Sequence, residues 1–305
     1  MIIYLAGGIT GNLIGDWKNI MDLYLVSLNT EKKRLDEIIN DFLNYGEAEY
    51  EDFIDKKDMN IYLAGNDGYR KDRFKISTKD LNILESYFYL RKQEWMFPLI
   101  KEFKNFLLDS GAFTFMSQAK NHKVEWDEYI EEYAEFINKN DIKLFFELDI
   151  DSIVGIEEVE RLRAKLEKLT GKKSIPVWHV SRGHDYWLKM VKEYEYVAIG
   201  GIVTKEIKPK HYPIFKQLIK EAHAQNCKVH GLGFTNLKGL TKYKFDSVDS
   251  TAWLSGNRFG SVYKFNGITM IKIDKKEGQR IKNKKTAMNN FIEWLKFCKY
   301  AEKYL

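Results

Sequence analysis

The stretch KVHGLGFTNLKGLTKYKFDSVDSTAWLSGNR, residues 228–258, decides how the rest of this chain is interpreted. It opens with an apolar segment, 229–233, whose two glycines predict a strand that lets the backbone turn or a ligand come close. A short helix follows, and then a second strand over 245–249. That strand carries Asp246 and Asp249, although acidic residues are depleted in strands. Because barrel enzymes keep their chemistry where strands end, we expect a catalytic edge here.

The same alternation of short apolar runs and helix-period segments recurs along the chain. Strands are predicted over residues 2–7, 60–65, 105–109, 143–149, 175–180, 196–201, 228–233 and 245–249. Helices are predicted over 16–28, 31–43, 80–103, 125–138, 157–169, 185–194, 212–225 and 237–243. Strands that alternate with helices indicate parallel βαβ units, and eight such units favour an α/β fold of the (β/α)8 TIM-barrel type. A doubly wound open sheet is the competing topology, because it has the same periodicity.

The C-terminal part of the chain departs from this alternation. Residues 261–273 predict a hairpin, with Asn266-Gly267 as a two-residue turn signal. A basic run over 275–285 follows, and then an amphipathic helix over 287–304. One face of that helix carries Phe291, Trp294, Leu295 and Cys298. We therefore expect a single domain over residues 1–305, with a barrel over about 1–260 and a C-terminal hairpin, basic segment and helix over about 261–305.

Composition excludes several classes of protein. With 44% hydrophobic residues in 305, the chain is expected to fold around a substantial core. The net charge of +5 suits an anionic partner without requiring one. Cys227 and Cys298 are too few for a disulfide framework or a cysteine-based zinc site, so we expect no metal and a reducing compartment. The sequence shows no signal peptide and no membrane span, and we expect a cytoplasmic protein with no cofactor and no membrane partner.

Several predicted strand ends carry side chains suited to chemistry. The third strand ends in Asp109-Ser110-Gly111, followed by Phe113, and the fourth runs into Glu147, Asp149 and Asp151, which alternation places on one face. The sixth ends in Gly200-Gly201, where the backbone can meet a planar ligand. Carboxylates can pair with the donor-rich edge of a guanine-like base, and an aromatic face can stack on it. These strand ends therefore predict a pocket for such a base.

Four motifs occur in order along about half of the chain. They are Asp109–Thr114 (DSGAFT), Ala198–Ile202 (AIGGI), His230–Thr235 (HGLGFT) and Lys244–Val248 (KFDSV). They are similar to the D-S-G-G-F-Q, A-I-G-G-L, M-G-V-G-T and M-F-D-C-V segments of the tRNA-guanine transglycosylase superfamily. The chain from Asp109 through Arg258 thus resembles that superfamily, whose members exchange a base at C1′ of a nucleotide sugar.

The resemblance implies a role for each matching residue. Asp246 corresponds to the family nucleophile, with Asp249 as the rival candidate, and Asp109 corresponds to the general acid/base. The residues expected to contact the substrate are Phe113 as a stacking plate, Asp149, Ser110, Gly111, Gly200, Gly201, and His179 in the place of a family glutamine. The division of labour is chemically reasonable, because one carboxylate must stay ionised to attack C1′ while another protonates the departing base.

Two departures from the family concern the parts that serve tRNA. No C-x-C-x-x-C…H zinc site follows the last strand, and residues 250–258 replace the family's P-T-R-x-G-R loop. These departures resemble the zinc-lacking, often phage-encoded branch that inserts 7-deazaguanines into DNA. We therefore expect exchange of guanine in DNA for a 7-deazaguanine such as 7-cyano-7-deazaguanine, in the host cytoplasm if phage-encoded. The alternatives are a zinc-less tRNA enzyme, a nucleoside deoxyribosyltransferase, and a non-catalytic nucleic-acid-binding barrel.

Overall fold

The computed structural model describes residues 1–6, 79, 81–111, 114, 124–234, 236–254, 260–274 and 283–305. Eight parallel strands form one sheet in the order β4-β3-β2-β1-β8-β7-β6-β5. They are β1 Ile2–Ala6, β2 Asn82–Ser86, β3 Asn105–Asp109, β4 Leu144–Phe145, β5 Val177–Trp178, β6 Tyr196–Ile199, β7 Lys228–Gly231 and β8 Ser247–Ser250. This is the sequential order of a TIM-type barrel, as the alternation predicted.

The two ends of the strand order, β4 and β5, also meet. Phe146 forms a parallel bridge with Ile175, just beyond β4 and just before β5. The Ile175 amide donates to the Phe145 carbonyl at 2.8 Å, and the Glu147 amide donates to the Ile175 carbonyl at 3.1 Å. These bonds join the edges of the sheet, so the strands curl into a barrel instead of an open, doubly wound sheet.

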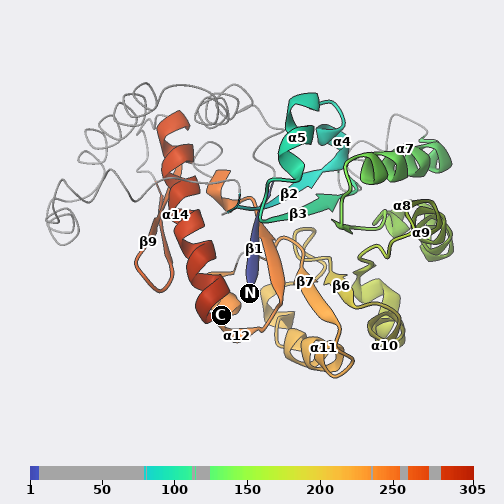
Figure 1. Ribbon diagram of the computed structural model, residues 1–305. Coiled ribbons are helices and arrows are strands. Elements are labelled where there is room, and N and C mark those ends of the chain that lie inside the picture. Colours follow the sequence, from blue (N-terminus) through green and yellow to red (C-terminus); the bar gives the residue numbers. More distant parts are fainter. Residues whose placement is uncertain are drawn as a thin grey trace, which may run out of the picture.

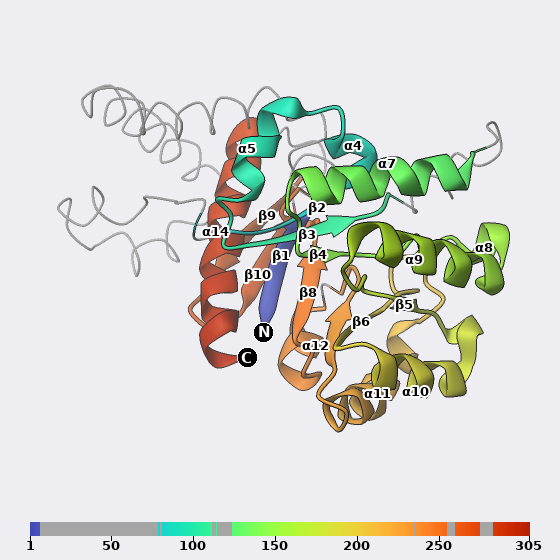
Figure 2. The ribbon, with the colours of Figure 1, turned by 45° about the vertical axis from the view of Figure 1, so that its right-hand side comes forward.

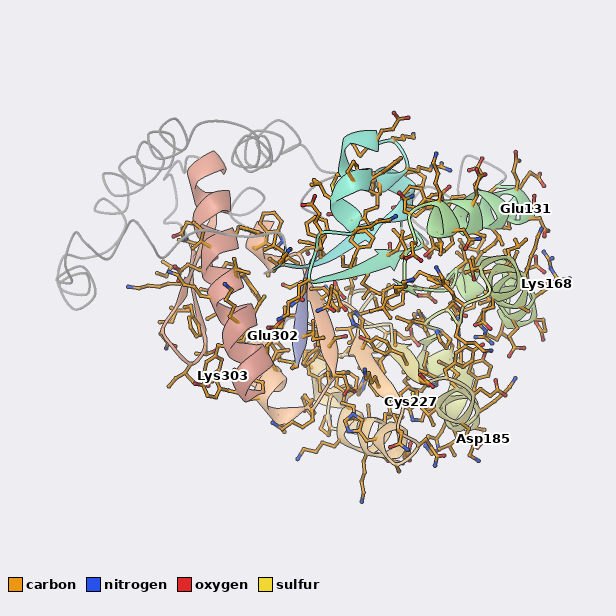
Figure 3. All side chains as sticks on the ribbon, viewed as in Figure 1. Glu131, Lys168, Asp185, Cys227, Glu302 and Lys303 are labelled. Carbon is orange, nitrogen blue, oxygen red and sulfur yellow. The ribbon has the colours of Figure 1, made fainter. Side chains whose placement is uncertain are left out.

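Helices surround the strands (Figures 1 and 2). They are α4 Tyr87–Leu90, α5 Phe97–Ile100, α7 Trp126–Lys139, α8 Asp151–Val154, α9 Ile156–Thr170, α10 Gly183–Glu193, α11 Ile214–His223, α12 Leu237–Lys242 and α14 Asn283–Tyr304. Short 3-10 turns lie at η3 Glu94–Met96, η4 Val180–Arg182, η5 Pro209–His211 and η6 Ala252–Leu254. Charged side chains such as Glu131, Lys168 and Asp185 cover the outer surfaces of α7, α9 and α10 (Figure 3). None of the helices in the described ranges is long and apolar enough to cross a membrane.

Alternation along the strands divides the core into two layers. Tyr4, Leu84 and Leu107 belong to a small cluster inside the barrel. Their neighbours Ile3, Ile83 and Leu108 belong to the larger cluster between the strands and the helices. Successive residues of a strand face opposite sides of the sheet, whereas residues in register on neighbouring strands face the same side. This rule places Asp249, which is in register with Tyr4, on the inside of the barrel.

One segment that the sequence predicted to be a helix contains a strand. The helix predicted over 80–103 contains β2 and then only the short helices α4, η3 and α5. Both faces of β2 are buried, with Leu84 inside and Ile83 outside. Its sequence, NILES, has no apolar/polar alternation that would distinguish a strand from a helix. The strand predicted over 60–65 and the helices predicted over 16–28 and 31–43 lie outside the described residues.

The C-terminal appendage is confirmed as a hairpin and a helix. Strands β9 Ser261–Phe265 and β10 Met270–Asp274 pair in antiparallel register. Their connection spans Asn266 to Thr269, longer than the two-residue turn expected, and the Asn266 side chain accepts from the amides of Ile268 and Thr269. Helix α14 lies beside β1, β9 and η6, and buries Phe291, Trp294, Leu295 and Cys298 as predicted. It therefore occupies the place of the eighth barrel helix.

Candidate active site

The carboxyl ends of the parallel strands bring most of the predicted site residues to one mouth of the barrel. Asp109 is the last residue of β3, and Asp249 is the penultimate residue of β8. Asp149, His179 and Gly200 follow β4, β5 and β6. Asp249 and Asp149 both raise the pKa of Asp109 through their charges, which indicates that the three carboxylates share one electrostatic environment. The mouth therefore collects three of the predicted aspartates.

Backbone contacts fix the position of Asp109. Its Oδ2 accepts from the Gly111 amide at 3.1 Å. Gly111 has φ +87°, and a Cβ atom there would lie 2.6 Å from Cβ of Phe88, so only glycine fits this turn. From α7, the Tyr129 hydroxyl donates to the Ser110 carbonyl at 2.7 Å. The strand end that presents Asp109 is thus held from both sides.

Asp109 is the carboxylate at this mouth best suited to carry a proton. Burial raises the pKa of Asp109 to about 6, although the Gly111 hydrogen bond acts in the opposite direction. The negative charges of Asp249 and Asp149 raise it further. A carboxyl group that titrates near neutral pH can both give and take a proton, which is what a general acid/base requires.

Asp249 combines fixed orientation with an available oxygen. Its Oδ1 accepts from the Gly233 amide at 2.6 Å and lies 3.3 Å from Nε2 of His230. Within the described part of the chain, Oδ2 has no hydrogen-bond partner, and the side chain is 12% exposed. Gly233 has φ +65°, and a Cβ there would lie 2.2 Å from Val203, so the amide that holds Asp249 depends on a glycine. Asp249 therefore has one oxygen held in place and one that the described residues do not engage.

Asp246, the residue expected to be the nucleophile, lies at the opposite end of the barrel. It precedes β8, and its carbonyl accepts from the amide of Ile2, the first residue of β1. Its Oδ2 accepts from the Val229 amide at 2.7 Å and lies 2.9 Å from Nε2 of His223 on α11. The structure does not bring Asp246 together with Asp109. Residues three apart on a strand face opposite sides, so Asp246 and Asp249 were never candidates for the same pocket.

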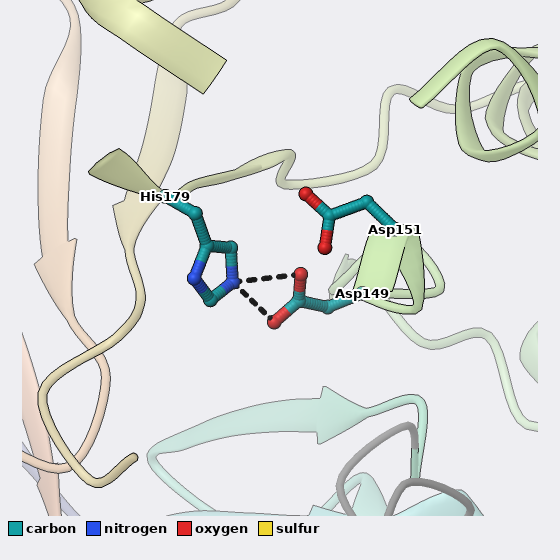
Figure 4. Close-up of side chains that lie close together, drawn as sticks. All are labelled: Asp149, Asp151 and His179. Atoms are coloured by element: carbon teal, nitrogen blue, oxygen red, sulfur yellow. Dashed lines mark hydrogen bonds and ion pairs between the residues drawn. The ribbon is translucent and has the colours of Figure 1, made fainter. Parts of the chain in front are cut away.

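At the same mouth, a histidine is held between two carboxylates. Nε2 of His179 lies 2.9 Å from each oxygen of Asp149, and Nδ1 lies 3.0 Å from Oε2 of Glu206. Figure 4 shows the imidazole directed at Asp149, with Asp151 beyond it. Burial lowers the pKa of His179, but the hydrogen bonds to Asp149 and Glu206 and the charges of Asp149 and Asp151 outweigh it and raise the pKa to about 9. His179 is therefore an imidazolium at neutral pH that donates to both carboxylates.

The predicted backbone platform at Gly200-Gly201 is filled by this histidine and its partner. A Cβ on Gly200 would lie 2.7 Å from the His179 ring, and one on Gly201 would lie 2.7 Å from Oε2 of Glu206. The Gly200 amide donates to the Trp178 carbonyl, and the Gly201 carbonyl accepts from the Ile207 amide. The two glycines thus make room for the His179–Glu206 pair, and these two backbone groups are used within the fold.

Arg182 joins the three acids that follow β4. Its guanidinium donates to Glu147 and to Asp151, each at 2.9 Å, and lies 3.5 Å from Oδ1 of Asp149. The acids were expected on one face of a strand, but β4 ends at Phe145 and Asp151 already belongs to α8. Glu147 is fully buried and also pairs with Arg163 of α9 at 2.9 Å. The acids gather around one arginine, so their charges are compensated by Arg182 and Arg163.

Asp149, Asp151 and His179 place one ligand atom each within 4.8 Å of one another, a spacing that would suit a metal ion. Their donor set argues against that use. The carboxylates already accept from Arg182, and both ring nitrogens of His179 already face carboxylate oxygens of Asp149 and Glu206. The sequence prediction that no metal is required stays a prediction.

The other residues that the sequence offered as substrate contacts differ in where they lie. Ser110 is buried, and its hydroxyl has no hydrogen-bond partner among the described residues. Phe113 and Arg258 lie outside the described residues. Trp253 packs against Phe291 of α14 and is only 2% exposed, so it belongs to the core.

Sequence reasoning missed Glu206, Arg182 and His230 as parts of this mouth. Glu206 follows β6 by several residues, in a segment with no strand or helix pattern, and nothing in the sequence pairs it with His179. Arg182 lies in the short η4 turn after β5 and in none of the four motifs. His230 begins one of the motifs and is a polar residue in an apolar strand, which was a usable signal.

No protein-family model matches this chain, and no curated protein is found to be similar to it.

Proposed function

We propose that this protein is a base-exchange transglycosylase that replaces guanine in DNA with a 7-deazaguanine through a covalent aspartyl-glycosyl intermediate. The observation that carries the proposal is the pair formed by Asp109, with its pKa raised to about 6, and Asp249 at the same mouth, whose Oδ2 has no hydrogen-bond partner among the described residues. Two carboxyl groups in different environments are what the exchange of groups at a sugar C1′ requires.

In the proposed first step, Oδ2 of Asp249 attacks C1′ of the target nucleotide. The bond from C1′ to N9 of guanine breaks as protonated Asp109 gives its proton to the leaving base. The products are an ester between Asp249 and C1′ and free guanine. In the second step Asp109 removes the N9 proton of the incoming 7-deazaguanine, whose nitrogen attacks C1′ and releases Asp249. The nucleophile is thus assigned to Asp249, in place of Asp246.

Asp149 is the proposed reader of the base. A carboxylate can accept from the N1–H and the exocyclic amino group of guanine, a pair of donors that adenine lacks at these positions. His179 and Arg182 donate to Asp149 and fix its orientation. Both nitrogens of His179 are engaged by Asp149 and Glu206, so His179 acts through Asp149 and not as a direct substitute for the family glutamine.

DNA is favoured over tRNA because the chain lacks the family's zinc-site cysteines. Its two cysteines are both buried on different elements, Cys227 just before β7 and Cys298 within α14. Incubation with labelled guanine and either duplex DNA or tRNA tests the choice directly. We expect label to enter DNA. Label in tRNA alone would favour the zinc-less tRNA enzyme, and salt-sensitive DNA binding without exchange or adduct would overturn the enzymatic proposal.

A further inference from the structure

A chain of polar side chains crosses the interior of the barrel, where TIM barrels are otherwise packed with apolar residues. Tyr196 of β6 hydrogen-bonds through its hydroxyl to Oγ of Ser247 on β8. Oγ of Ser247 lies 2.5 Å from Nδ1 of His230 on β7. Nε2 of His230 lies 3.3 Å from Oδ1 of Asp249. The chain ends on the carboxylate proposed as nucleophile.

Burying this series of polar side chains costs free energy unless each of them has a hydrogen-bond partner. His230 is fully buried, and Ser247 is 1% exposed. The His230 ring lies between Phe146 and Tyr4, with ring centroids 5.3 Å and 6.0 Å away. An apolar residue would pack into this site without the need for hydrogen bonds, so a histidine here indicates a specific task.

The chemistry of these side chains determines which atom donates and which accepts in each of their hydrogen bonds. A carboxylate only accepts, so Nε2 of His230 carries the proton that faces Asp249. In a neutral imidazole Nδ1 is then an acceptor, which requires Ser247 to donate to it and to accept from Tyr196. Burial raises the pKa of Tyr196, which keeps its hydroxyl protonated as the first donor. Each member of the chain therefore has one consistent role.

This arrangement is not a serine hydrolase triad, despite its three residue types. A serine nucleophile must reach the substrate, whereas Ser247 is enclosed in the barrel beneath Tyr196. The end of the chain that reaches the mouth is Asp249, whose side chain is 12% exposed. The buried side chains therefore act on the Asp249 carboxylate from the interior of the barrel.

We propose that His230 is a positioning residue, locked by Ser247 and Tyr196 as the Nε2–H tautomer, that holds Oδ1 of Asp249 and thereby aims Oδ2 at the sugar. The proposal rests on the proposed function for its catalytic consequence, but its physical content, the tautomer and the hydrogen bond, does not. Together with the Gly233 amide, His230 gives Oδ1 two donors, so the carboxylate cannot rotate freely.

The first test measures the tautomer in the whole protein. Histidine labelled with ¹⁵N gives six imidazole signals, and His230→Gln identifies the one from His230. We expect the Nε2–H tautomer in the wild type, and loss of this pure tautomer in Ser247→Ala. An Nδ1–H ring or an imidazolium in the wild type would overturn the proposal. Because no substrate is needed, this result stands whether or not the protein exchanges bases.

The second test measures adduct formation in a single turnover on DNA. His230→Leu, which removes the donor, should slow adduct formation about 10- to 100-fold with unchanged DNA affinity, as expected for one lost hydrogen bond to a charged group. His230→Gln, which keeps an N–H donor, should restore most of the rate. An adduct that forms at the wild-type rate in folded His230→Leu contradicts the positioning role. Absence of adduct in the wild type would instead count against the proposed function.

Discussion

A Cβ atom on Gly200 would stand 2.7 Å from the Cε1 and Nε2 atoms of His179, so this imidazole requires a glycine beside it. The A-I-G-G motif therefore has a structural reason in this chain. Its two glycines accommodate the His179–Glu206 pair, which in turn orients Asp149.

Gly200→Ala is expected to displace the His179 ring and lower the free energy of unfolding by about 1–3 kcal/mol, as overpacking does. Urea titration of Gly200→Ala, His179→Ala and the double variant measures the coupling. Because His179→Ala makes room for the methyl group, Gly200→Ala should cost much less in that background. Equal costs in the two backgrounds would show that the contact is not the reason for the glycine.

The stability of the protein should fall as the pH rises between about 6.5 and 9, because folded His179 holds a proton that the unfolded chain has lost. The contribution is fully present below 6.5 and disappears as the pH passes 9. The difference between 6.5 and about 9 corresponds to at most about 3 kcal/mol. Urea titrations at several pH values, compared with His179→Gln, measure it. His184→Gln, on α10, is the control that should keep the slope.

Asp109→Asn is expected to abolish exchange and to stabilise the fold at pH 7–8. The pKa of Asp109 is raised from 3.8 to about 6, so ionisation in the folded state is penalised, and stability is lost as the pH rises from 3.8 through 6. Replacement by a neutral amide removes a penalty of up to about 3 kcal/mol. The gain should vanish near pH 4, where the wild-type carboxyl is neutral too. A variant less stable than the wild type at pH 8 would contradict the environment described for Asp109.

Arg182→Gln should lower both stability and guanine affinity. The substitution leaves Glu147 fully buried with Arg163 as its remaining cationic partner, and a broken buried ion pair costs about 3–5 kcal/mol. Asp149 also loses a donor. The matched control is Arg161→Gln on the exposed side of α9, whose solvent-exposed surface pairs should contribute little to stability. Similar losses in the two variants would remove Arg182 from the site.

The barrel could be predicted because its strands alternate with amphipathic helices, and seven of the eight predicted strands coincide with or overlap strands of the described barrel. The strand β2 could not, because it is buried on both faces and is followed by helix formers such as Leu90. The sequence instead predicted a strand over residues 60–65, which lie outside the described residues.

The candidate site was predictable only where a residue stands at a strand end. Asp109 ends β3, His179 directly follows β5, and Asp149 lies a few residues after β4, so all three come to the same mouth. Asp246 was chosen by motif similarity, although strand alternation alone places Asp246 and Asp249 on opposite faces. Glu206 and Arg182 reach the site through loop geometry, which depends on tertiary structure and leaves no spacing pattern in the sequence.

Covalent trapping on DNA with paired variants tests the central claim most directly. Wild type and Asp246→Asn should both give a protein–DNA adduct on a denaturing gel, because Asp246 pairs with His223 at the far end of the barrel. Asp249→Asn should give none, although it binds DNA and keeps its fold. An adduct in Asp249→Asn, or its loss in a folded Asp246→Asn, would contradict the assignment of Asp249 as the nucleophile.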